Sequence, residues 1–394
     1  MKILVICQHY HPEPFRITDI CEEWIKLGHE VTVVTGKPNY PMGKIYDGYK
    51  GKEKRDEIVN GVKIHRCFVV PRKKGIIYRF LNYYSYALSA KRYVNKIKEK
   101  FDVVFVNQLS PVMMVAPALT YKKKYGAQVV LYCLDLWPES LVAGGIKRDS
   151  FLYRHYHKVS AKIYRGVDKI AITSKLFKKY FLEQFGITED KITYLPQYAE
   201  SVFDCELCQK ESNGQIDLLF AGNIGNAQSV ETIVRAAADT KDIQDLYWHI
   251  VGDGIALEKC QALAHKLQVK NIIFHGRKPL EEMPIFYQKA DAMLVTLMKD
   301  DVLSLTLPGK VQTYMSAGKM VLAAADGEIS RLLSEVDCGL CVGAEDFEGL
   351  ARIAREFYTL KEERRKEYGK NAKQFYETYF AKSIFFEKVD ELLK

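Results

Sequence analysis

The stretch from Ile216 to Gly225 reads Ile-Asp-Leu-Leu-Phe-Ala-Gly-Asn-Ile-Gly. An apolar run that ends in a glycine turn is typical of a strand leading into a helix, and a helical pattern follows over about 228–240. Glycines in such a turn let backbone amides approach a phosphate at the helix N-terminus. A tight turn without a ligand explains the glycines equally well. The turn lacks the Gly-Lys-Ser/Thr of a P-loop, so ATP hydrolysis is not expected.

The alternation of apolar runs with helical patterns continues in both directions from this stretch. Such alternation is typical of a parallel sheet covered by helices on both faces. The predicted strands cover residues 3–7, 31–35, 62–69, 103–107, 128–133 and 169–173 in the first half, and 216–221, 247–251, 271–275, 292–296, 320–323 and 339–342 in the second. Besides the helix over 228–240, helices are predicted over about 16–27, 76–99, 111–124, 151–165, 255–267, 346–358 and 361–378, and a turn at Asn60-Gly61. The sequence therefore predicts an α/β protein with two doubly wound, Rossmann-like domains that face a cleft, where ligands bind beyond the carboxyl ends of the strands.

The boundary between the two domains is predicted in a polar stretch without clear periodicity, over about residues 196–213. We expect a first domain over residues 1–200 and a second over residues 201–378. The remaining C-terminal helix, about 379–394, is expected to pack back on the first domain.

The composition is that of an ordinary globular protein. The chain has 394 residues, of which 48% are hydrophobic and 27% charged, which excludes disordered and collagen-like classes. No apolar run approaches the roughly 18–20 residues of a membrane span, and the apolar start is too short for a signal peptide. A cytoplasmic location is therefore expected. The nine cysteines include two distant Cys-x-x-Cys pairs, at 205/208 and 338/341, which we interpret as reduced thiols rather than a zinc site.

Positive charge is concentrated in the first half of the chain. The net charge of +9 divides into +15 for residues 1–200 and −6 for residues 201–394. Residues 72–100 hold nine Lys and Arg, among them Arg72, Lys73, Lys74 and Arg79, with six interleaved aromatic residues and one acid. A basic helix with aromatic residues fits the interface of an anionic bilayer, although an ordinary packed helix with a solvated face has the same pattern.

Two further motifs lie at predicted helix starts. In the stretch from Leu307 to Lys319, Pro308 suits the start of a helix and Gly318 its end. A positive charge at a helix N-terminus interacts unfavourably with the helix dipole. An anion bound beside Lys310 would explain why a lysine stands in the first turn. The stretch from Cys133 to Ser140 places Asp135, a tryptophan and Glu139 after a strand of the first domain, where they can recognise substrate hydroxyls or cap the next helix.

Taken together, these motifs resemble those of a nucleotide-sugar glycosyltransferase of the GT-B fold, in the retaining family 4, and most closely those of bacterial capsule and O-antigen enzymes. The likeness runs from residue 3 to about residue 343. It rests on Gln8-His9-Tyr10, Pro12-Glu13, Phe15-Arg16-Ile17, Asp19, Gly28 to Gly36, Pro38 to Pro41, Asp135 to Glu139, Gly222 to Gly225 with Gln228, Gly252-Asp253-Gly254 and Pro308 to Gly318.

The resemblance implies a donor site in the second domain. It places the turn of Gly222, Asn223 and Gly225, together with Lys310, beside the donor diphosphate, and the backbone around Arg277 beside the nucleobase. The chain departs from the family at two points. Thr313 stands where relatives carry a ribose-binding glutamate, with Glu328 as the candidate replacement, and neutral residues near Asn223 and Gln228 replace an Arg and a Lys.

The resemblance also implies the chemistry. A retaining transfer by front-face attack needs no protein nucleophile, and without any Asp-x-Asp in the chain we expect no obligatory metal and no cofactor. Groups already positioned in the folded protein would stabilise the negative charge that develops on the donor diphosphate. Glu13, Asp135 and Glu139 are the catalytic candidates, with Arg16 on the acceptor side. The expected donor is a UDP-linked sugar, with an N-acetyl amino sugar favoured.

A lipid-linked acceptor would explain the basic segment. We expect a polyprenyl-diphosphate saccharide, used at the inner face of the plasma membrane by a peripherally bound enzyme that builds surface polysaccharide. Three alternatives remain open. They are an enzyme of the same fold with a small soluble acceptor, a nucleic-acid-binding protein that uses the basic half, and a two-domain NAD enzyme. The chain has no recognisable nucleic-acid-binding module and no G-x-G-x-x-G after its first strand, so neither nucleic acid nor NAD is expected.

Overall fold

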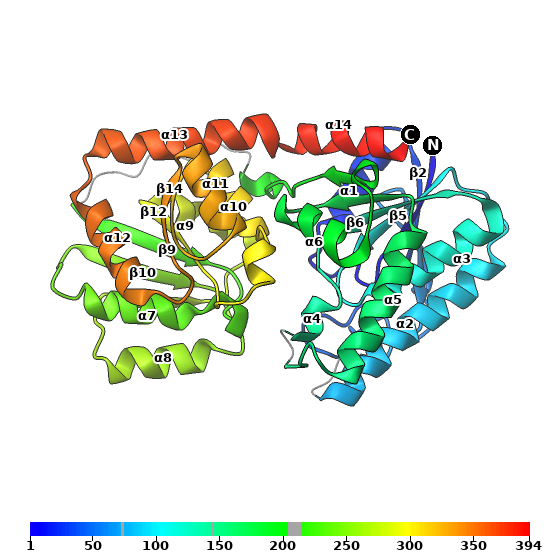
Figure 1. The fold of residues 1–394 in the computed structure, drawn as a ribbon, viewed down its shortest axis with the longest axis horizontal. Helices are drawn as coiled ribbons and strands as arrows, with labels where there is room; N and C mark the ends of the chain where they lie inside the picture. Colours follow the sequence, from blue (N-terminus) through cyan, green and yellow to red (C-terminus); the bar gives the residue numbers. More distant parts are fainter. Residues whose placement is uncertain (72–74, 143–144, 204–213) are drawn as a thin grey trace. The chain divides into compact units, whose positions relative to one another are not determined.

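A computed structural model describes residues 1–71, 75–142, 145–203 and 214–394. The chain forms two compact units (Figure 1). The first unit comprises Met1–Thr173, Phe177–Leu195 and Asp390–Lys394, and the second comprises Ser174–Leu176 and Pro196–Val389. The C-terminal helix therefore contributes its last residues to the first unit and the remainder to the second.

The first unit is built on an eight-stranded sheet. Its strands are β1 (Lys2–Ile6), β2 (Glu30–Gly36), β3 (Asp56–Val59), β4 (Val62–Cys67), β5 (Val103–Gln108), β6 (Gln128–Cys133), β7 (Lys169–Ile172) and β8 (Ile192–Tyr194). Its helices are α1 (Ile17–Lys26), α2 (Ile76–Lys96), α3 (Ala116–Tyr125), α4 (Glu139–Val142), α5 (Phe151–Gly166) and most of α6 (Leu176–Phe185). Helix α2 packs beside α3, and α3 beside α5 (Figure 1).

The strand order in this sheet is β3-β4-β2-β1-β5-β6-β7-β8. All neighbours are parallel except β3 and β4, which form an antiparallel hairpin. Asn60 and Gly61 form its turn with φ of 49° and 82°, which confirms the predicted turn. The order reverses between β1 and β5, and ligands of doubly wound sheets bind beside such a reversal. The residues after β1, β5 and β6 therefore lie at the edge where a ligand is expected.

The second unit is built on a six-stranded sheet. Its strands are β9 (Ile216–Ala221), β10 (Leu246–Val251), β11 (Ile272–Gly276), β12 (Ala292–Thr296), β13 (Met320–Ala324) and β14 (Gly339–Val342). Its helices are α7 (Val230–Asp239), α8 (Leu257–Lys266), α9 (Met283–Lys289), α10 (Gly309–Ser316), α11 (Glu328–Val336), α12 (Phe347–Thr359), α13 (Glu362–Tyr379) and α14 (Lys382–Leu393).

The second sheet has the order β11-β10-β9-β12-β13-β14 with parallel pairing throughout, which is the Rossmann order. Its apolar residues are buried against α7 and α12, and Trp248 is a fully buried member of this core. Strand β9 pairs with both β10 and β12, so it is the strand at which the order reverses. The glycine turn that follows β9 is therefore at the expected ligand-binding point.

Some short elements differ from the predictions. The strand β3 was not predicted because Asp56 and Glu57 interrupt any apolar pattern. The single helix predicted over 111–124 begins instead with a 3₁₀ turn, Val112–Val115, before α3. Helices α6, α9 and α11 and strand β8 were also not predicted. Within the described residues, no helix combines the length and the apolarity that a membrane span requires.

Candidate functional site

The glycine turn after β9 is held by close backbone packing. Gly222 and Gly252 have φ of 141° and 145°, a region that favours glycine. A Cβ atom on Gly252 would lie 1.8 Å from the carbonyl oxygen of Gly222, so only glycine allows the two loops to approach this closely. The loops after β9 and β10 therefore form one rigid edge of the second sheet.

Most amides of this turn already have acceptors within the protein. The N–H of Gly222 donates to the carbonyl of Val251 (2.9 Å), and the N–H of Ile224 donates to that of Asp253 (2.8 Å). The N–H of Gly225 donates to Oε1 of Gln228 (3.2 Å), which also accepts from Nδ2 of Asn223 (3.1 Å). These contacts make the turn rigid, and positive charge at this edge must come from a side chain.

Helix α10 supplies that charge. The Tyr314 hydroxyl donates to the carbonyl of Ala221 (3.0 Å) and accepts from the Ala221 N–H (3.1 Å), which fixes α10 to the end of β9. Four residues earlier, in the first turn of the helix, Nζ of Lys310 lies 3.9 Å from the centre of the Phe220 ring. A Cβ atom built on Gly222 would be 3.0 Å from this Nζ, so the glycine provides the space for the lysine.

Lys310 is partly buried as a residue, but its Nζ atom is fully buried and has no hydrogen-bond partner among the described residues. Burial alone lowers the pKa of its amino group from 10.5 to about 7, because charge is costly in a site shielded from water. An unpaired buried ammonium is unfavourable unless something else neutralises it. The arrangement is that of a site prepared for an anion at the carboxyl end of β9.

A carboxylate that no sequence motif marks lies beside Thr313. The Thr313 hydroxyl donates to Oε2 of Glu200 at 3.2 Å, across 113 residues of sequence. Glu200 belongs to the polar stretch predicted as the domain boundary, which the structure assigns to the second unit, and no periodicity or motif marks it. No sequence signal could have associated it with α10.

The other predicted donor residues lie elsewhere in the second unit. Arg277 is exposed directly after β11. Glu328, the first residue of α11, is buried and pairs with Arg331 (2.6 Å), while its other oxygen accepts from the Leu176 N–H (3.2 Å). Both oxygens of Glu328 are thus already occupied by the protein.

In the first unit, Asp135 lies just after β6 at the carboxyl edge of the sheet. Its Oδ2 accepts from the Ser110 N–H at 3.0 Å, which joins the end of β6 to the end of β5. Ser110 is further held by the Trp137 indole N–H, which donates to its Oγ at 2.9 Å. Asp135 is only partly buried, whereas the other two catalytic candidates are fully buried.

Glu13 is a buried carboxylate that joins two loops. One oxygen accepts from the N–H groups of Asn39 (2.8 Å) and Tyr40 (2.6 Å). The other accepts from the Tyr10 N–H (3.3 Å) and contacts Nδ1 of His9 (3.0 Å). These contacts hold the loop after β2 against the loop after β1, which is a structural use of the carboxylate.

Glu139 lies in a second buried network. Its oxygens accept from the hydroxyls of Tyr153 (2.6 Å) and Tyr180 (3.2 Å) and pair with Arg148 (3.1 Å). The network ties α4 to α5 and α6. Asp135 is therefore the candidate whose surroundings best suit contact with a substrate.

The remaining predicted residues belong to the first unit. Arg16 precedes α1. Burial raises the pKa of the Tyr132 hydroxyl in β6, and the positive charge of Arg16 offsets part of that rise. Arg79 lies in α2, while Arg72, Lys73 and Lys74 lie outside the described residues. The pair Cys205/Cys208 also lies outside them, and Cys338 is a buried free thiol.

Comparison with known families identifies the chain. Residues 16–197 match the family described as Glycosyltransferase Family 4, and residues 209–375 match Glycosyl transferases group 1. The chain is a family 4 glycosyltransferase of the GT-B fold. The two matches fall on the two Rossmann-like units. The glycine turn and Lys310 lie within one match, and Asp135 lies within the other.

Relatives of this glycosyltransferase act in bacteria. It is 25% identical over 381 residues to the putative colanic acid biosynthesis glycosyl transferase WcaI of Escherichia coli K12, covering 90% of this chain and 92% of that protein. It is 28% identical over 259 residues to the probable glycosyltransferase WbjE of Pseudomonas aeruginosa, covering 63% and 64%. The crystal structure of Anabaena HepE in complex with UDP has the same fold, with a TM-score of 0.73 at 12% identity over 100% of this chain and 99% of that one.

Proposed function

We propose that this glycosyltransferase transfers a sugar from a UDP-sugar to a lipid-linked saccharide during the synthesis of a bacterial surface polysaccharide. The donor assignment rests on the buried amino group of Lys310 beside Gly222, which has no hydrogen-bond partner in the part of the chain that the structure describes. A nucleoside diphosphate is the anion that a glycosyltransferase must hold. The similarity to WcaI, named for colanic acid biosynthesis, supports the polysaccharide, and the HepE complex supports UDP.

In this proposal, Lys310 stabilises the leaving group. Cleavage of the anomeric C–O bond transfers negative charge to the UDP diphosphate, and a cation already in place stabilises that charge without reorganising. The rigid turn from Gly222 to Gly225 holds the diphosphate against the lysine. Thr313 and Glu200 together take the place of a ribose-binding glutamate, since the Thr313 hydroxyl donates to the Glu200 carboxylate and positions it.

We assign the acceptor to the first unit, with Asp135 as the carboxylate that orients the acceptor hydroxyl or steadies the oxocarbenium ion. Transfer proceeds with retention, by attack from the face of the leaving group. An oxygen of the departing diphosphate can then take the proton of the attacking hydroxyl, so no nucleophile on the protein is required. A sugar with an N-acetyl group is the favoured donor, and a peripheral site at the inner face of the plasma membrane would supply the acceptor.

A screen of nucleotide sugars by thermal unfolding tests the donor assignment. A UDP-sugar at 100 times its dissociation constant should stabilise the protein by about 2.7 kcal/mol, whereas the GDP and ADP analogues at the same concentration should have little effect. UDP-N-acetylglucosamine and UDP-glucose serve as the pair that tests the N-acetyl preference. Stabilisation by GDP- or ADP-sugars alone would contradict the proposal.

The affinity for UDP should depend on pH in a predictable direction. Because the pKa of Lys310 is lowered to about 7 in the free protein, the amino group loses its proton as the pH rises above 7. A bound diphosphate raises that pKa again, so binding above pH 7 must take up a proton. Calorimetry should show affinity falling by up to about tenfold per pH unit above 7. An affinity that stays constant from pH 7 to 9 would remove Lys310 from the diphosphate site.

A further inference from the structure

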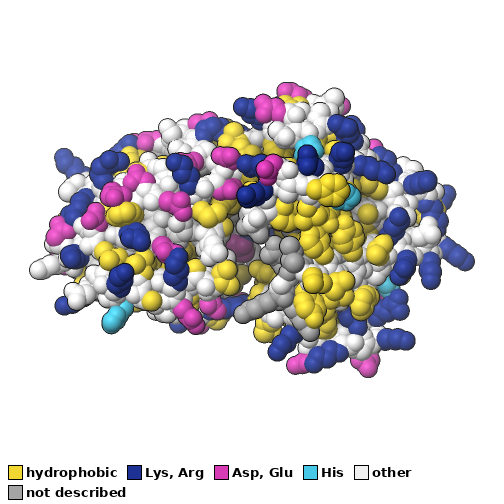
Figure 2. Space-filling model, turned by 60° about the horizontal axis from the view of Figure 1, so that its bottom comes forward, with side chains coloured by type: hydrophobic (Ala, Val, Ile, Leu, Met, Phe, Trp, Pro, Cys, Tyr) yellow, Lys and Arg dark blue, Asp and Glu magenta, His cyan; other side chains and the backbone are white. Residues whose placement is uncertain are grey.

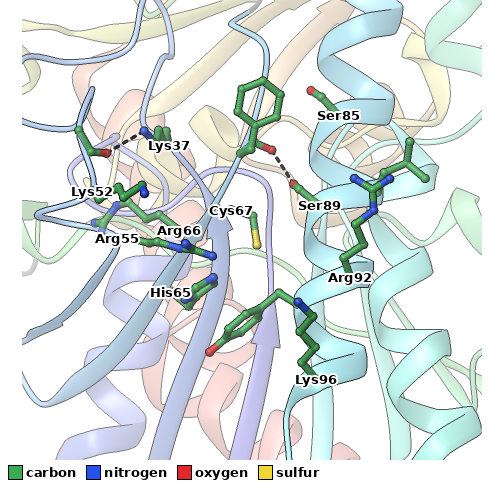
Figure 3. A pocket seen from close by; sticks show the side chains of 14 residues that line it. Lys37, Lys52, Arg55, His65, Arg66, Cys67, Ser85, Ser89, Arg92 and Lys96 are labelled. Carbon is green, nitrogen blue, oxygen red and sulfur yellow. Dashed lines mark hydrogen bonds between the residues drawn. The ribbon is translucent and has the colours of Figure 1, made fainter.

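A basic pocket of about 580 Å³ opens on the first unit, and the described residues that line it differ from those assigned above. Strand β4, Lys37 directly after β2, the loop around residues 51–55 and one face of α2 line it (Figure 3). Among the described residues that line the pocket, none is Asp or Glu and six are Lys or Arg, namely Lys37, Lys52, Arg55, Arg66, Arg92 and Lys96. The cations of β4 and the loop stand on one side, and those of α2 on the other (Figure 3).

Most of this charge is not neutralised by the protein. Arg66 contacts Glu57, and Lys37 donates to the carbonyls of Lys50 and Gly51. For the other four cations of the lining, Lys52, Arg55, Arg92 and Lys96, the described part of the chain provides no ion pair. A concave surface with several unpaired cations favours a compact ligand with more than one negative charge.

Two buried polar atoms of the lining also lack a partner within residues 1–71, 75–142, 145–203 and 214–394. The Nε2 atom of His65 and the Nε atom of Arg66 make no hydrogen bond to the described residues, although these residues are only 4% and 2% exposed. The opposite nitrogen of His65 contacts Asp56, and its ring stacks on Tyr93. Buried polar atoms are normally satisfied, so this pocket has unused capacity for an oxygen-rich ligand.

An apolar stripe on α2 leads to the pocket. Ile77, Leu81, Tyr84 and Leu88 follow helical spacing and are all exposed, Ile77 to 71%. Leu88 belongs both to this stripe and to the pocket lining. Figure 2 shows hydrophobic side chains gathered on the exposed face of the first unit, with Lys and Arg around them. An apolar stripe that ends in a basic pocket fits a ligand with an acyl or prenyl chain and a phosphate head.

We propose that this pocket binds the phosphate group of a membrane lipid while the apolar stripe lies in the bilayer interface. The inference rests on the membrane part of the proposed function and not on the donor. This binding differs from a general attraction between a basic surface and an anionic membrane, because particular residues of the pocket hold the phosphate. The guanidinium groups of Arg55 and Arg92 suit a phosphate, since each can donate two parallel hydrogen bonds.

The test compares two variants of equal charge. The pocket variant carries Arg55→Ala, Arg92→Ala and Lys96→Ala. The control variant carries Lys123→Ala, Lys158→Ala and Lys162→Ala, at exposed positions of the same unit that do not line the pocket. All six side chains are exposed, so neither variant should unfold, and unchanged melting temperatures verify this.

Vesicle sedimentation at low salt has two arms that separate the sources of the phosphate. One uses phosphatidylcholine vesicles with phosphatidylglycerol, and the other uses phosphatidylcholine vesicles with a few per cent of polyprenyl diphosphate. In at least one arm the pocket variant should bind at least about thirtyfold more weakly than wild type, and the control variant less than about threefold. The arm that shows the difference identifies the lipid.

Three results would overturn the proposal. The first is an equal loss in both variants, which would mean general charge attraction. The second is a wild-type protein that binds neither vesicle. The third is pocket-dependent binding of inorganic pyrophosphate without vesicle binding, which would assign the pocket to a soluble anion. UDP binding is measured in parallel, so failure of the donor assignment is recognised separately.

Discussion

Replacing Lys310 with methionine should reduce kcat/KM for the donor by about 10- to 150-fold, while making the protein more stable at neutral pH. The loss corresponds to one charge-assisted contact of roughly 1.5–3 kcal/mol between the ammonium and the diphosphate. Steady-state kinetics with varied UDP-sugar measures this loss.

The variant gains stability because the amino group of Lys310 is buried in the folded protein. The pKa of Lys310 is about 7 in the folded protein and 10.5 in an unfolded chain, so between these values the unfolded state holds more protons. The buried lysine therefore destabilises the fold most below pH 7, on the order of a few kcal/mol, and this cost disappears as the pH rises towards 10.5. The variant should be more stable than wild type by an amount that shrinks with increasing pH.

Lys319→Met is the matched control. This lysine lies just after α10, and its amino group donates to the carbonyls of Gln288 (3.3 Å) and Ala290 (2.7 Å). Its replacement should lower stability without changing donor kinetics. If Lys310→Met behaves in the same way, its amino group has a structural role and the donor site is elsewhere.

Asp135→Asn should lower kcat by at least about a hundredfold, the lower range for a positioned acid or base, and change the UDP dissociation constant less than about twofold. Asparagine keeps the size of the side chain and an oxygen that can accept from the Ser110 N–H. The substitution therefore removes the charge but not the contact between β5 and β6. Turnover and UDP calorimetry on the same preparation measure the two effects.

Glu139→Gln provides the comparison for Asp135. Its carboxylate is held by Arg148, Tyr153 and Tyr180, so the main effect should be lower thermal stability. If Asp135→Asn weakens UDP binding as much as it lowers kcat, Asp135 lies on the donor side. That result would refute the assignment of the acceptor to the first unit.

The fold could be predicted from the sequence because its central strands are continuous apolar runs. The bounds predicted for β6, β9, β12 and β14 are those of the structure. The missed elements carry weak local signals. Strand β8 has three half-buried residues, and α9 has only seven residues with a proline in its first turn. Their structure depends on packing against neighbours that the local sequence does not specify.

A site residue could be predicted only where its type is unusual for the local segment in which it stands. Lys310 was identified because a cation is unfavourable at a helix start, whereas its burial depends on contacts with Phe220 and Gly222 ninety residues away. The networks around Glu13 and Glu139 join several loops and helices. The pairing of Glu200 with Thr313 likewise arises only in the folded chain.

The central claim is that the second unit holds a nucleoside diphosphate on Lys310. Calorimetric titration of UDP and of uridine into wild type and Lys310→Met at pH 6.5 tests it most directly, because the difference between the two ligands isolates the diphosphate. We predict that wild type binds UDP at least about a hundredfold more tightly than uridine, and that Lys310→Met reduces this ratio by about tenfold or more. The same ratio in both proteins would contradict the account.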